Sequence, residues 1–217
     1  MTGVISVGWH VAPASPPIAL RHCGTCRQTM PFRSSGKVRL NANGRKLDAW
    51  LIYKCRSCDR TWNCTLYERM DVGAFDHDTL LAMQHSHASW VQAQELDVAA
   101  LMQHCDRIEH CREVKIWKPP FFDLPGDWRH IRLQIRVLAQ TGARLDRVLA
   151  GEFTLSRSAM ERLIQDGLLH INPSPKQLRR TLRSDVTLTI DRGILTAIDQ
   201  RTVQNALFAQ WTEPTET

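Results

Sequence analysis

Two Cys-x-x-Cys pairs constrain this chain more than any other feature. Cys23 and Cys26 form the first pair, and Cys55 and Cys58 form the second. A structural Zn²⁺ takes four tetrahedral ligands, and each tight turn with two cysteines supplies two thiolates. A redox pair needs only one such motif, usually at the start of a helix. We therefore favour zinc over redox chemistry or four unrelated thiols, and predict one structural Zn²⁺ with no coordination position left for substrate.

The residues between the two pairs predict a β-hairpin. Residues 38–40 and 47–53 are apolar, aromatic-rich runs, and the Asn-Gly step at 43–44 separates them. Such a step between two β-prone runs is a strong hairpin signal. Residues 61–67 are also β-prone and predict a third strand. This order resembles a zinc ribbon over residues 21–69, in which Gly24 of the first turn is expected to supply a positive φ.

Composition indicates an ordinary globular protein. The chain has 217 residues, 43% of them hydrophobic, which allows one large or two to three small domains. No run approaches the roughly 18 apolar residues that span a bilayer. Residues 1–20 hold no Lys or Arg, so we expect no secretory signal. Seven cysteines without an export signal favour metal ligation over disulfides. We expect a cytoplasmic protein with no membrane partner.

The charge of +6 is unevenly distributed. Residues 21–69 carry 11 Lys and Arg against 3 Asp and Glu, and residues 144–190 carry 8 against 5. Residues 70–143 between them are acidic, with 7 basic residues against 10 acidic ones. Two basic blocks around an acidic middle are expected when two surfaces contact a polyanion.

Residues 144–190 predict a small unit of two helices and two short strands. Residues 144–150 form an amphipathic pattern, and Ser156 is a natural N-cap for a second helix over 157–166. Gly167 follows as the C′ residue that ends this helix. We expect strands at 168–171 and 186–190, with a basic run at 176–183 between them.

This segment resembles the alpha-L RNA-binding domain, the ribosomal-protein-S-four type found in ribosomal proteins, pseudouridine synthases and tyrosyl-tRNA synthetases. The matching positions are Arg144, Leu145, Asp146, Leu149, Ser156, Arg157, Ser158, Leu163, Ile164, Gly167 and Asp185. Two turns depart from the family pattern, because Ile171-Asn172-Pro173 replaces Val-Asn-Gly and Ser184-Asp185 replaces Gly-Asp. The resemblance implies a small α/β domain that binds structured RNA.

The arginines at the predicted helix starts favour an anionic ligand on physical grounds. Arg144 and Arg157 lie where the helix macrodipole is positive, so an unpaired cation there is slightly destabilising. A phosphate binds well at such a position, and added arginines strengthen the site. The alternative is an Arg157–Glu161 ion pair with Arg147 facing water. The candidate RNA-binding residues are Arg144, Arg147, Ser156, Arg157, Arg162, Lys176, Arg179 and Arg180.

The middle of the chain carries weaker signals. Residues 76–112 have apolar positions at helical spacing, and 114–117 and 131–137 read as two strands of a hairpin. Arg132 and Arg136 lie on the outward face of the second strand, where they extend a basic surface or, as we favour, form an ordinary solvated face. A second metal site and core, capping or surface roles are the two alternatives for a further group of histidines and cysteines, and we favour the latter. These residues are His85, His87, His104, Cys105, His110 and Cys111.

We predict an α+β protein in five segments. They are a flexible N-terminal segment (1–20), a zinc ribbon (21–69), a helical connector with a β-hairpin (70–143), an alpha-L-like domain (144–192) and a C-terminal extension (193–217). The order from about residue 20 to 190 also resembles a bacterial family catalogued as a domain of unknown function.

The sequence contains no nucleophile–base pair, phosphate-binding glycine loop or His-Glu metal motif. We therefore expect a non-enzymatic zinc protein that binds structured RNA, such as ribosomal or transfer RNA. The alternative is a protein-interaction adaptor whose zinc ribbon docks on a polymerase or ribosomal protein. An RNA-modifying enzyme that uses the central region is a third, less favoured interpretation.

Overall fold

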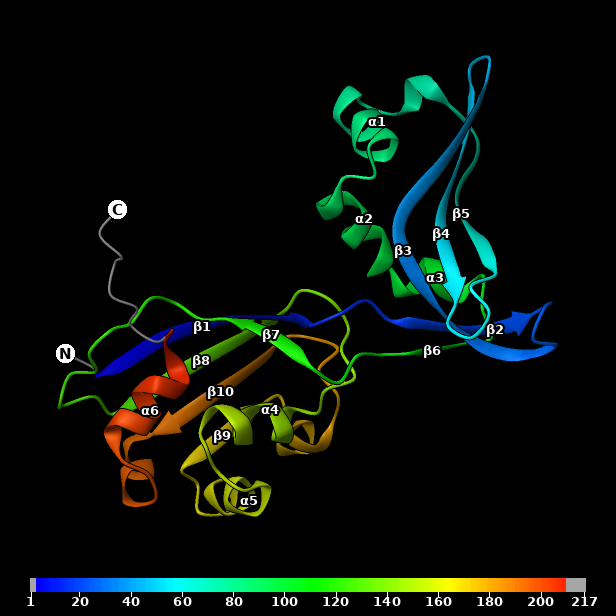
Figure 1. Cartoon of the computed structure of the whole chain (residues 1–217). Helices are drawn as coiled ribbons and strands as arrows, with labels where there is room; N and C mark the ends of the chain where they lie inside the picture. The colour runs from blue at the N-terminus through cyan, green and yellow to red at the C-terminus, as the bar shows by residue number, and fades with distance from the viewer. Residues whose placement is uncertain (1–2, 210–217) are drawn as a thin grey trace, which may run out of the picture. The chain divides into compact units, whose positions relative to one another are not determined.

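Two five-stranded sheets organise this computed structural model, which describes residues 3–209 (Figure 1). Each sheet belongs to its own compact unit. The first unit joins the chain up to Ala14 with the chain from Arg112 onward, and the second unit comprises Ser15–Cys111. The chain therefore leaves the first unit after one strand, builds the second, and returns. No helix in the described part of the chain is long and apolar enough to cross a membrane.

The sheet of the first unit has the strand order β7-β1-β8-β10-β9. Strands β1 and β8 pair in parallel, and the other neighbours pair antiparallel. The bounds are β1 Val4–Pro13, β7 Val114–Trp117, β8 His130–Val137, β9 Leu169–Asn172 and β10 Val186–Asp191. The helical segments are α4 Leu145–Glu152, α5 Arg157–Gln165, α6 Gln200–Leu207 and the 3₁₀ turns η2 Pro175–Arg179 and η3 Arg192–Thr196.

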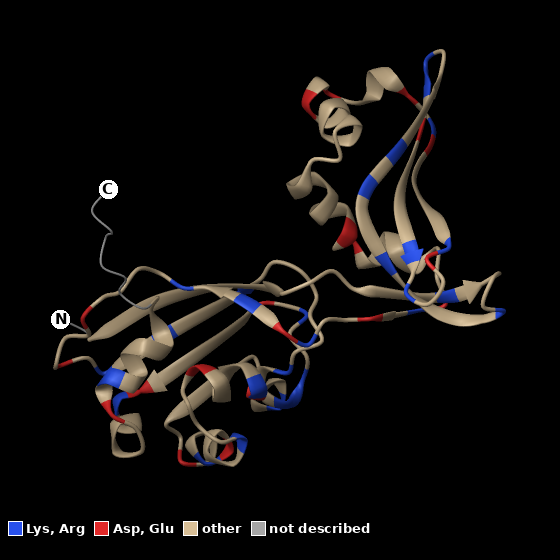
Figure 2. Cartoon of the chain, viewed as in Figure 1, with Lys and Arg blue, Asp and Glu red and all other residues tan. Residues whose placement is uncertain are grey.

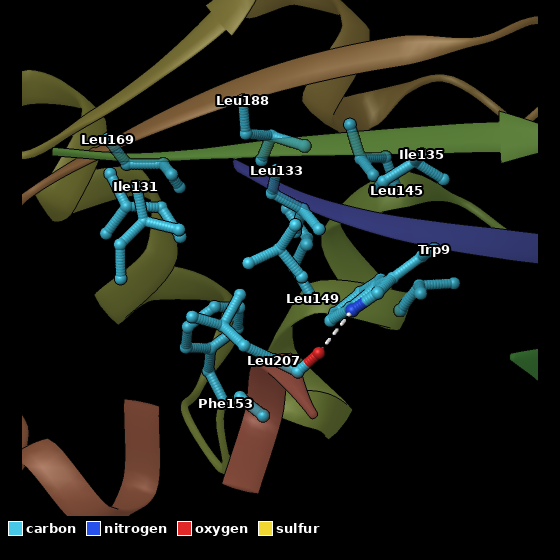
Figure 3. Close-up of a cluster of buried hydrophobic side chains, with 14 of the residues drawn as sticks. Trp9, Ile131, Leu133, Ile135, Leu145, Leu149, Phe153, Leu169, Leu188 and Leu207 are labelled. Carbon is cyan, nitrogen blue, oxygen red and sulfur yellow. Dashed lines mark hydrogen bonds between the residues drawn. The ribbon is translucent and has the colours of Figure 1, made fainter. Parts of the chain in front are cut away.

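Helices α4, α5 and α6 all cover the same face of this sheet (Figure 1). Strand β8 alternates between buried and exposed positions, as its period-two pattern predicts, so its apolar side chains meet the helices. The core in Figure 3 contains Trp9, Leu133 and Leu149, all fully buried. Each such residue contributes roughly 1.5–3 kcal/mol by burial. The Trp9 indole N–H donates to the Leu207 carbonyl at 2.9 Å and ties β1 to α6.

The second unit contains an antiparallel sheet of order β5-β4-β3-β2-β6, with helices α1–α3 packed against it. The strand bounds are β2 Ile18–Cys23, β3 Gln28–Asn43, β4 Lys46–Cys55, β5 Thr61–Asp71 and β6 Arg107–Glu109. The helical bounds are η1 Val72–Ala74, α1 His77–Gln84, α2 Ala88–Glu95 and α3 Val98–Met102.

The predicted hairpin is confirmed as β3 and β4, and the third strand as β5. The two-residue loop is Gly44-Arg45, because Asn43 still pairs with Lys46. Gly44 adopts φ +60°, which the loop of a tight hairpin requires and which glycine adopts without steric cost.

Three expectations about the chain's organisation are corrected. The segment 1–20 is not loose over its described part, because residues 4–13 form β1 in the interior of a sheet. Residues 114–117 and 131–137 do not form a hairpin, because β1 lies between them. Residues 76–112 form three short helices and strand β6 rather than one helical region.

The boundaries of the predicted domains also differ from the observed units. Residues 112–143 share one sheet with 144–192, so no unit begins at residue 144. Residues 193–209 of the predicted extension contain η3 and α6, which pack on the core of the first unit. Residues 210–217 of that extension, like residues 1–2, lie outside the described residues. The α+β class is confirmed.

Candidate functional site

The four predicted metal ligands converge at two neighbouring turns. Cys23 and Cys26 lie in the turn from β2 to β3, and Cys55 and Cys58 lie in the turn from β4 to β5. Their Sγ atoms all lie within 4.8 Å of one another. The Sγ–Sγ distances between the turns are 3.6 Å for Cys23–Cys58 and 3.9 Å for Cys26–Cys55. Tetrahedral ligation with bonds of about 2.3 Å places sulfurs about 3.8 Å apart. The four cysteines could therefore hold one metal ion.

The two turns have the same backbone form. The Arg27 N–H donates to the Cys23 carbonyl at 2.8 Å, and the Asp59 N–H donates to the Cys55 carbonyl at 3.0 Å. Arg27 and Asp59 adopt φ values of +57° and +55°. The positive φ therefore falls after the second cysteine of each pair. Contrary to the prediction, Gly24 does not supply it. A non-glycine residue in this region of φ is strained, and it persists only where the surrounding structure holds it.

The electrostatics of the cluster favour a bound cation. The backbone N–H groups of Cys26 and Thr25 stabilise the thiolate of Cys23 and lower its pKa to about 6. The neighbouring sulfur of Cys58, together with burial, raises the pKa of Cys26 to about 12. Ionisation of Cys26 beside the Cys23 thiolate is therefore opposed by repulsion between the two negative charges in the absence of a cation. A divalent cation removes that repulsion, because a coordinated thiol is deprotonated outright.

Aromatic side chains pack beside the cysteine cluster. Trp62 of β5 lies 5.8 Å from Phe32 and 4.9 Å from Tyr53, measured between ring centroids. The Arg21 guanidinium lies 4.3 Å above the Trp62 ring. At the surface, the Arg60 side chain donates to the Thr25 hydroxyl at 3.2 Å and joins one cysteine turn to the other. These contacts hold both turns in place from the strands behind them.

Among the described residues, the remaining cysteines and histidines form no second group of three or more candidate ligands. Within residues 3–209, the four cysteines are the one group of three or more candidate ligands within ligating distance. Cys64 is buried in β5, as predicted, and burial raises its pKa to about 11. The Cys105 thiol donates to the Leu101 carbonyl at 3.3 Å. His85 and His87 lie at the C-cap of α1 and the N-cap of α2.

The second candidate site, the basic surface around α4, α5 and η2, holds the predicted RNA-binding residues. Arg144 is the N-cap residue of α4, as expected, but its guanidinium binds the Asp146 carboxylate through Nε at 3.1 Å and Nη2 at 2.6 Å. Asp146 is only 2% exposed. A buried carboxylate needs such a partner. Arg144 therefore positions α4, which differs from the expected role of presenting a free guanidinium to phosphate.

The basic run at 176–183 lies against the start of α4. The Leu145 N–H donates to the Arg180 carbonyl at 3.0 Å, and Arg144 forms a β-bridge with Thr181. Figure 2 shows Lys and Arg gathering where these two segments meet. Arg179 binds Glu161 of α5 through Nη2 at 2.8 Å. The predicted alternative named the wrong partner, because Glu161 pairs with Arg179 rather than Arg157.

The other predicted RNA-binding cations of this surface are exposed, and their side chains form no hydrogen bond or ion pair within residues 3–209. They are Arg147, Arg157, Arg162, Lys176 and Arg180. Ser156 is the predicted N-cap of α5, since its hydroxyl accepts from the Ala159 N–H at 3.1 Å. Gly167 follows α5 with φ +71°, as predicted.

Comparison with models of protein families identifies the family of this chain. The model of the family described as "Protein of unknown function (DUF1062)" matches residues 40–175. The chain belongs to this family. No curated protein and no solved structure matches it. The matched region of this DUF1062 protein includes Cys55 and Cys58, both helices of the basic surface, and part of each structural unit.

Sequence reasoning missed one further surface of this DUF1062 protein. The face of the first sheet opposite the helices carries polar and basic residues from all five strands. The sequence indicates Arg132 and Arg136 on this face, and an ordinary solvated face is the prediction for them. The pairing with β1 and β7 adds His10 and Trp117 to the same face. The alternation of Ile5, Val7 and Trp9 was a usable signal for β1.

Proposed function

We propose that this chain is a non-enzymatic, zinc-containing cytoplasmic protein that binds structured RNA, such as ribosomal or transfer RNA. The zinc-ribbon-like turns of the second unit supply a structural metal centre. The alpha-L-like helices of the first unit supply the phosphate contacts. The observation that carries the proposal is the set of five exposed, unpaired cations on the basic surface around α4, α5 and η2.

The donor set and its spacing support zinc as the metal. Four sulfur ligands at tetrahedral separation are typical of Zn²⁺ or an iron centre, whereas Mg²⁺ and Ca²⁺ take oxygen ligands. Four protein ligands fill the zinc coordination sphere, so the ion would hold the two turns together and take no part in a reaction. Its binding energy would then stabilise the folded form of the second unit.

The start of α5 has the features of a phosphate contact. The Ser156 hydroxyl satisfies the Ala159 N–H. The N–H groups of Arg157 and Ser158, ahead of it in the first turn, have no partner inside the helix. The positive end of the macrodipole and the unpaired Arg157 side chain lie at the same place. A phosphate there would relieve the repulsion between the two.

Salt dependence tests the proposal. Five phosphate contacts predict a slope of log K against log salt of roughly −4 to −5, or a several-hundred-fold loss of affinity between about 50 and 200 mM salt. The probe is a fluorescein-labelled RNA stem–loop, followed by fluorescence anisotropy. The double variant Arg147→Glu/Arg157→Glu should bind more than about 100-fold more weakly, with a slope shallower by about 2.

The matched control is Arg201→Glu, which reverses an exposed charge on α6. It should bind the stem–loop within about twofold of the wild type, since it lies outside the basic surface. Circular dichroism establishes that each variant is folded. If the folded double variant retains wild-type affinity, the phosphate contacts are refuted and the adaptor interpretation is favoured.

A further inference from the structure

The sheet of the first unit leaves one broad face without a helical cover. Residues that are neighbours across strands share a face, so the register defines its members. One row runs Trp117, His10, Arg136; the next runs Gly8, Gln134, Thr187, Asn172; and the third runs Ser6, Arg132, Thr189, His170. Helices α4, α5 and α6 lie on the opposite side (Figure 1). We call these rows, with Lys115, His130 and Asp191, the open face.

The charge on the open face is strongly one-sided. Lys115, Arg132 and Arg136 are exposed cations on three different strands. Asp191 is the one acidic residue among the described strand positions of this face. Its Oδ2 atom lies 3.2 Å from Nδ1 of His130. None of the three cations forms an ion pair within residues 3–209, although the Asp185 carboxylate lies at the end of β8, where it accepts at 2.8 Å from the N–H of Val137, the residue after Arg136. A polyanion complements such a surface.

Trp117 adds an aromatic platform to this charge. Its side chain is 50% exposed at the β7 edge, although neighbouring Val114 and Ile116 pack on the core. Gly8, one row away on β1, leaves open space, because nothing lies within 4 Å of where its Cβ would be. A flat, uncovered patch therefore adjoins the indole. Nucleic-acid bases stack on exposed aromatic side chains of β-sheets in this way.

We propose that the open face binds a short single-stranded stretch of RNA. Bases would stack on Trp117, and phosphates would contact Lys115, Arg132 and Arg136. Five strands span about 19 Å at about 4.8 Å per spacing, which is room for a short stretch of nucleotides with a base stacked on Trp117. Side chains of Gln134 and Asn172 provide hydrogen-bond partners for 2′-hydroxyl groups or base edges.

Continuity with the basic surface supports RNA as the occupant. The open face ends at β9, and β9 packs against η2, which carries Lys176 and Arg179. A single-stranded segment next to a bound stem–loop would pass around the β9 edge of the sheet from η2 onto the open face. This inference rests on the RNA-binding function proposed above, and the two are tested with separate probes.

The experiment compares three fluorescein-labelled probes by anisotropy: single-stranded oligouridine, its abasic analogue of equal length, and the stem–loop. Trp117→Ala should weaken oligouridine binding about tenfold and change binding of the abasic analogue less than twofold, because the analogue cannot stack. Arg132→Gln/Arg136→Gln should weaken both single-stranded probes about tenfold or more. Trp117→Leu, which keeps an apolar side chain but no π-face, should behave like Trp117→Ala.

Two matched controls lie away from the open face. Phe122→Ala removes an aromatic side chain that is 51% exposed and packs 5.9 Å from Phe208, and Arg201→Gln removes an exposed charge on α6. Neither should change oligouridine binding more than twofold. Equal oligouridine affinities for wild type and both Trp117 variants would overturn the inference. Stem–loop binding without oligouridine binding would overturn it and leave the proposed function standing, whereas failure to bind any probe would overturn both.

Discussion

Replacement of Arg144 by alanine should destabilise the first unit and thereby show that this arginine has a structural role. Its guanidinium makes two hydrogen bonds to Asp146, at 3.1 and 2.6 Å, and Asp146 is 2% exposed. Removal of one partner of a buried pair costs about 3–5 kcal/mol. The Arg144 side chain is 44% exposed, so water screens the pair and can replace part of the interaction. We expect a loss of about 2 kcal/mol.

The assay is native-state hydrogen exchange of β8 amides by mass spectrometry, which reports the opening of the first unit separately from the second. A loss of about 2 kcal/mol corresponds to roughly 30-fold faster exchange where global opening governs the rate. Arg147→Ala is the matched control. It lies three residues further along α4, is exposed and unpaired, and should change stability by less than about 0.5 kcal/mol.

A double-mutant cycle separates the ion pair from other effects. In an Asp146→Asn background the buried charge is gone, so Arg144→Ala should cost clearly less than it does alone. Equal exchange rates for the Arg144→Ala and Arg147→Ala variants would refute the structural role. In that case Arg144 would rejoin the candidate phosphate contacts.

Metal removal and pH test the second unit. Purified protein should contain about one zinc per chain. Cys55→Ser should abolish both zinc binding and the protection of β3 and β4 amides from hydrogen exchange, whereas Cys105→Ser should retain both. A zinc content that is unchanged by Cys55→Ser would contradict the four-cysteine site. Burial raises the pKa of Cys64 from 9.0 to about 11. Between those values the unfolded state releases a proton that the folded state keeps. The free energy of unfolding should therefore fall by about 1 kcal/mol from pH 9 to pH 10, by about 1 kcal/mol more from pH 10 to pH 11, and level off above pH 11. The urea midpoint should fall with pH in the wild type and fall less steeply in Cys64→Ala. Equal slopes for the two proteins would rule out this effect of Cys64.

Local patterns predicted local structure well. The Asn-Gly step predicted the β3–β4 hairpin because Gly44 readily adopts the positive φ that a two-residue hairpin loop requires. Ser156 and Gly167 correctly marked the ends of α5, since caps depend on neighbouring backbone groups alone. Gly24 failed as a prediction because the geometry of the turn placed the positive φ at Arg27, after the second cysteine.

Long-range pairing was not predictable in the same way. Residues 114–117 and 131–137 are near neighbours in sequence and suggested a hairpin, yet residues 4–13 pair with both. Period-two patterns identify strands but carry no information about which strands become partners. The ion-pair partners of Arg144 and Arg179 likewise depended on how α4, α5 and η2 pack.

The amino-acid sequence alone determined the four-cysteine cluster and the three strands β3, β4 and β5 beside it, because thiolate spacing and turns act over a few residues. Tertiary structure alone decided which arginines are free and which hold a carboxylate. It also assembled the open face, by placing Trp117 and His10 beside Arg136. The physical reason is that a side chain's exposure and partners are set by segments far away in sequence, which come together only when the core is buried.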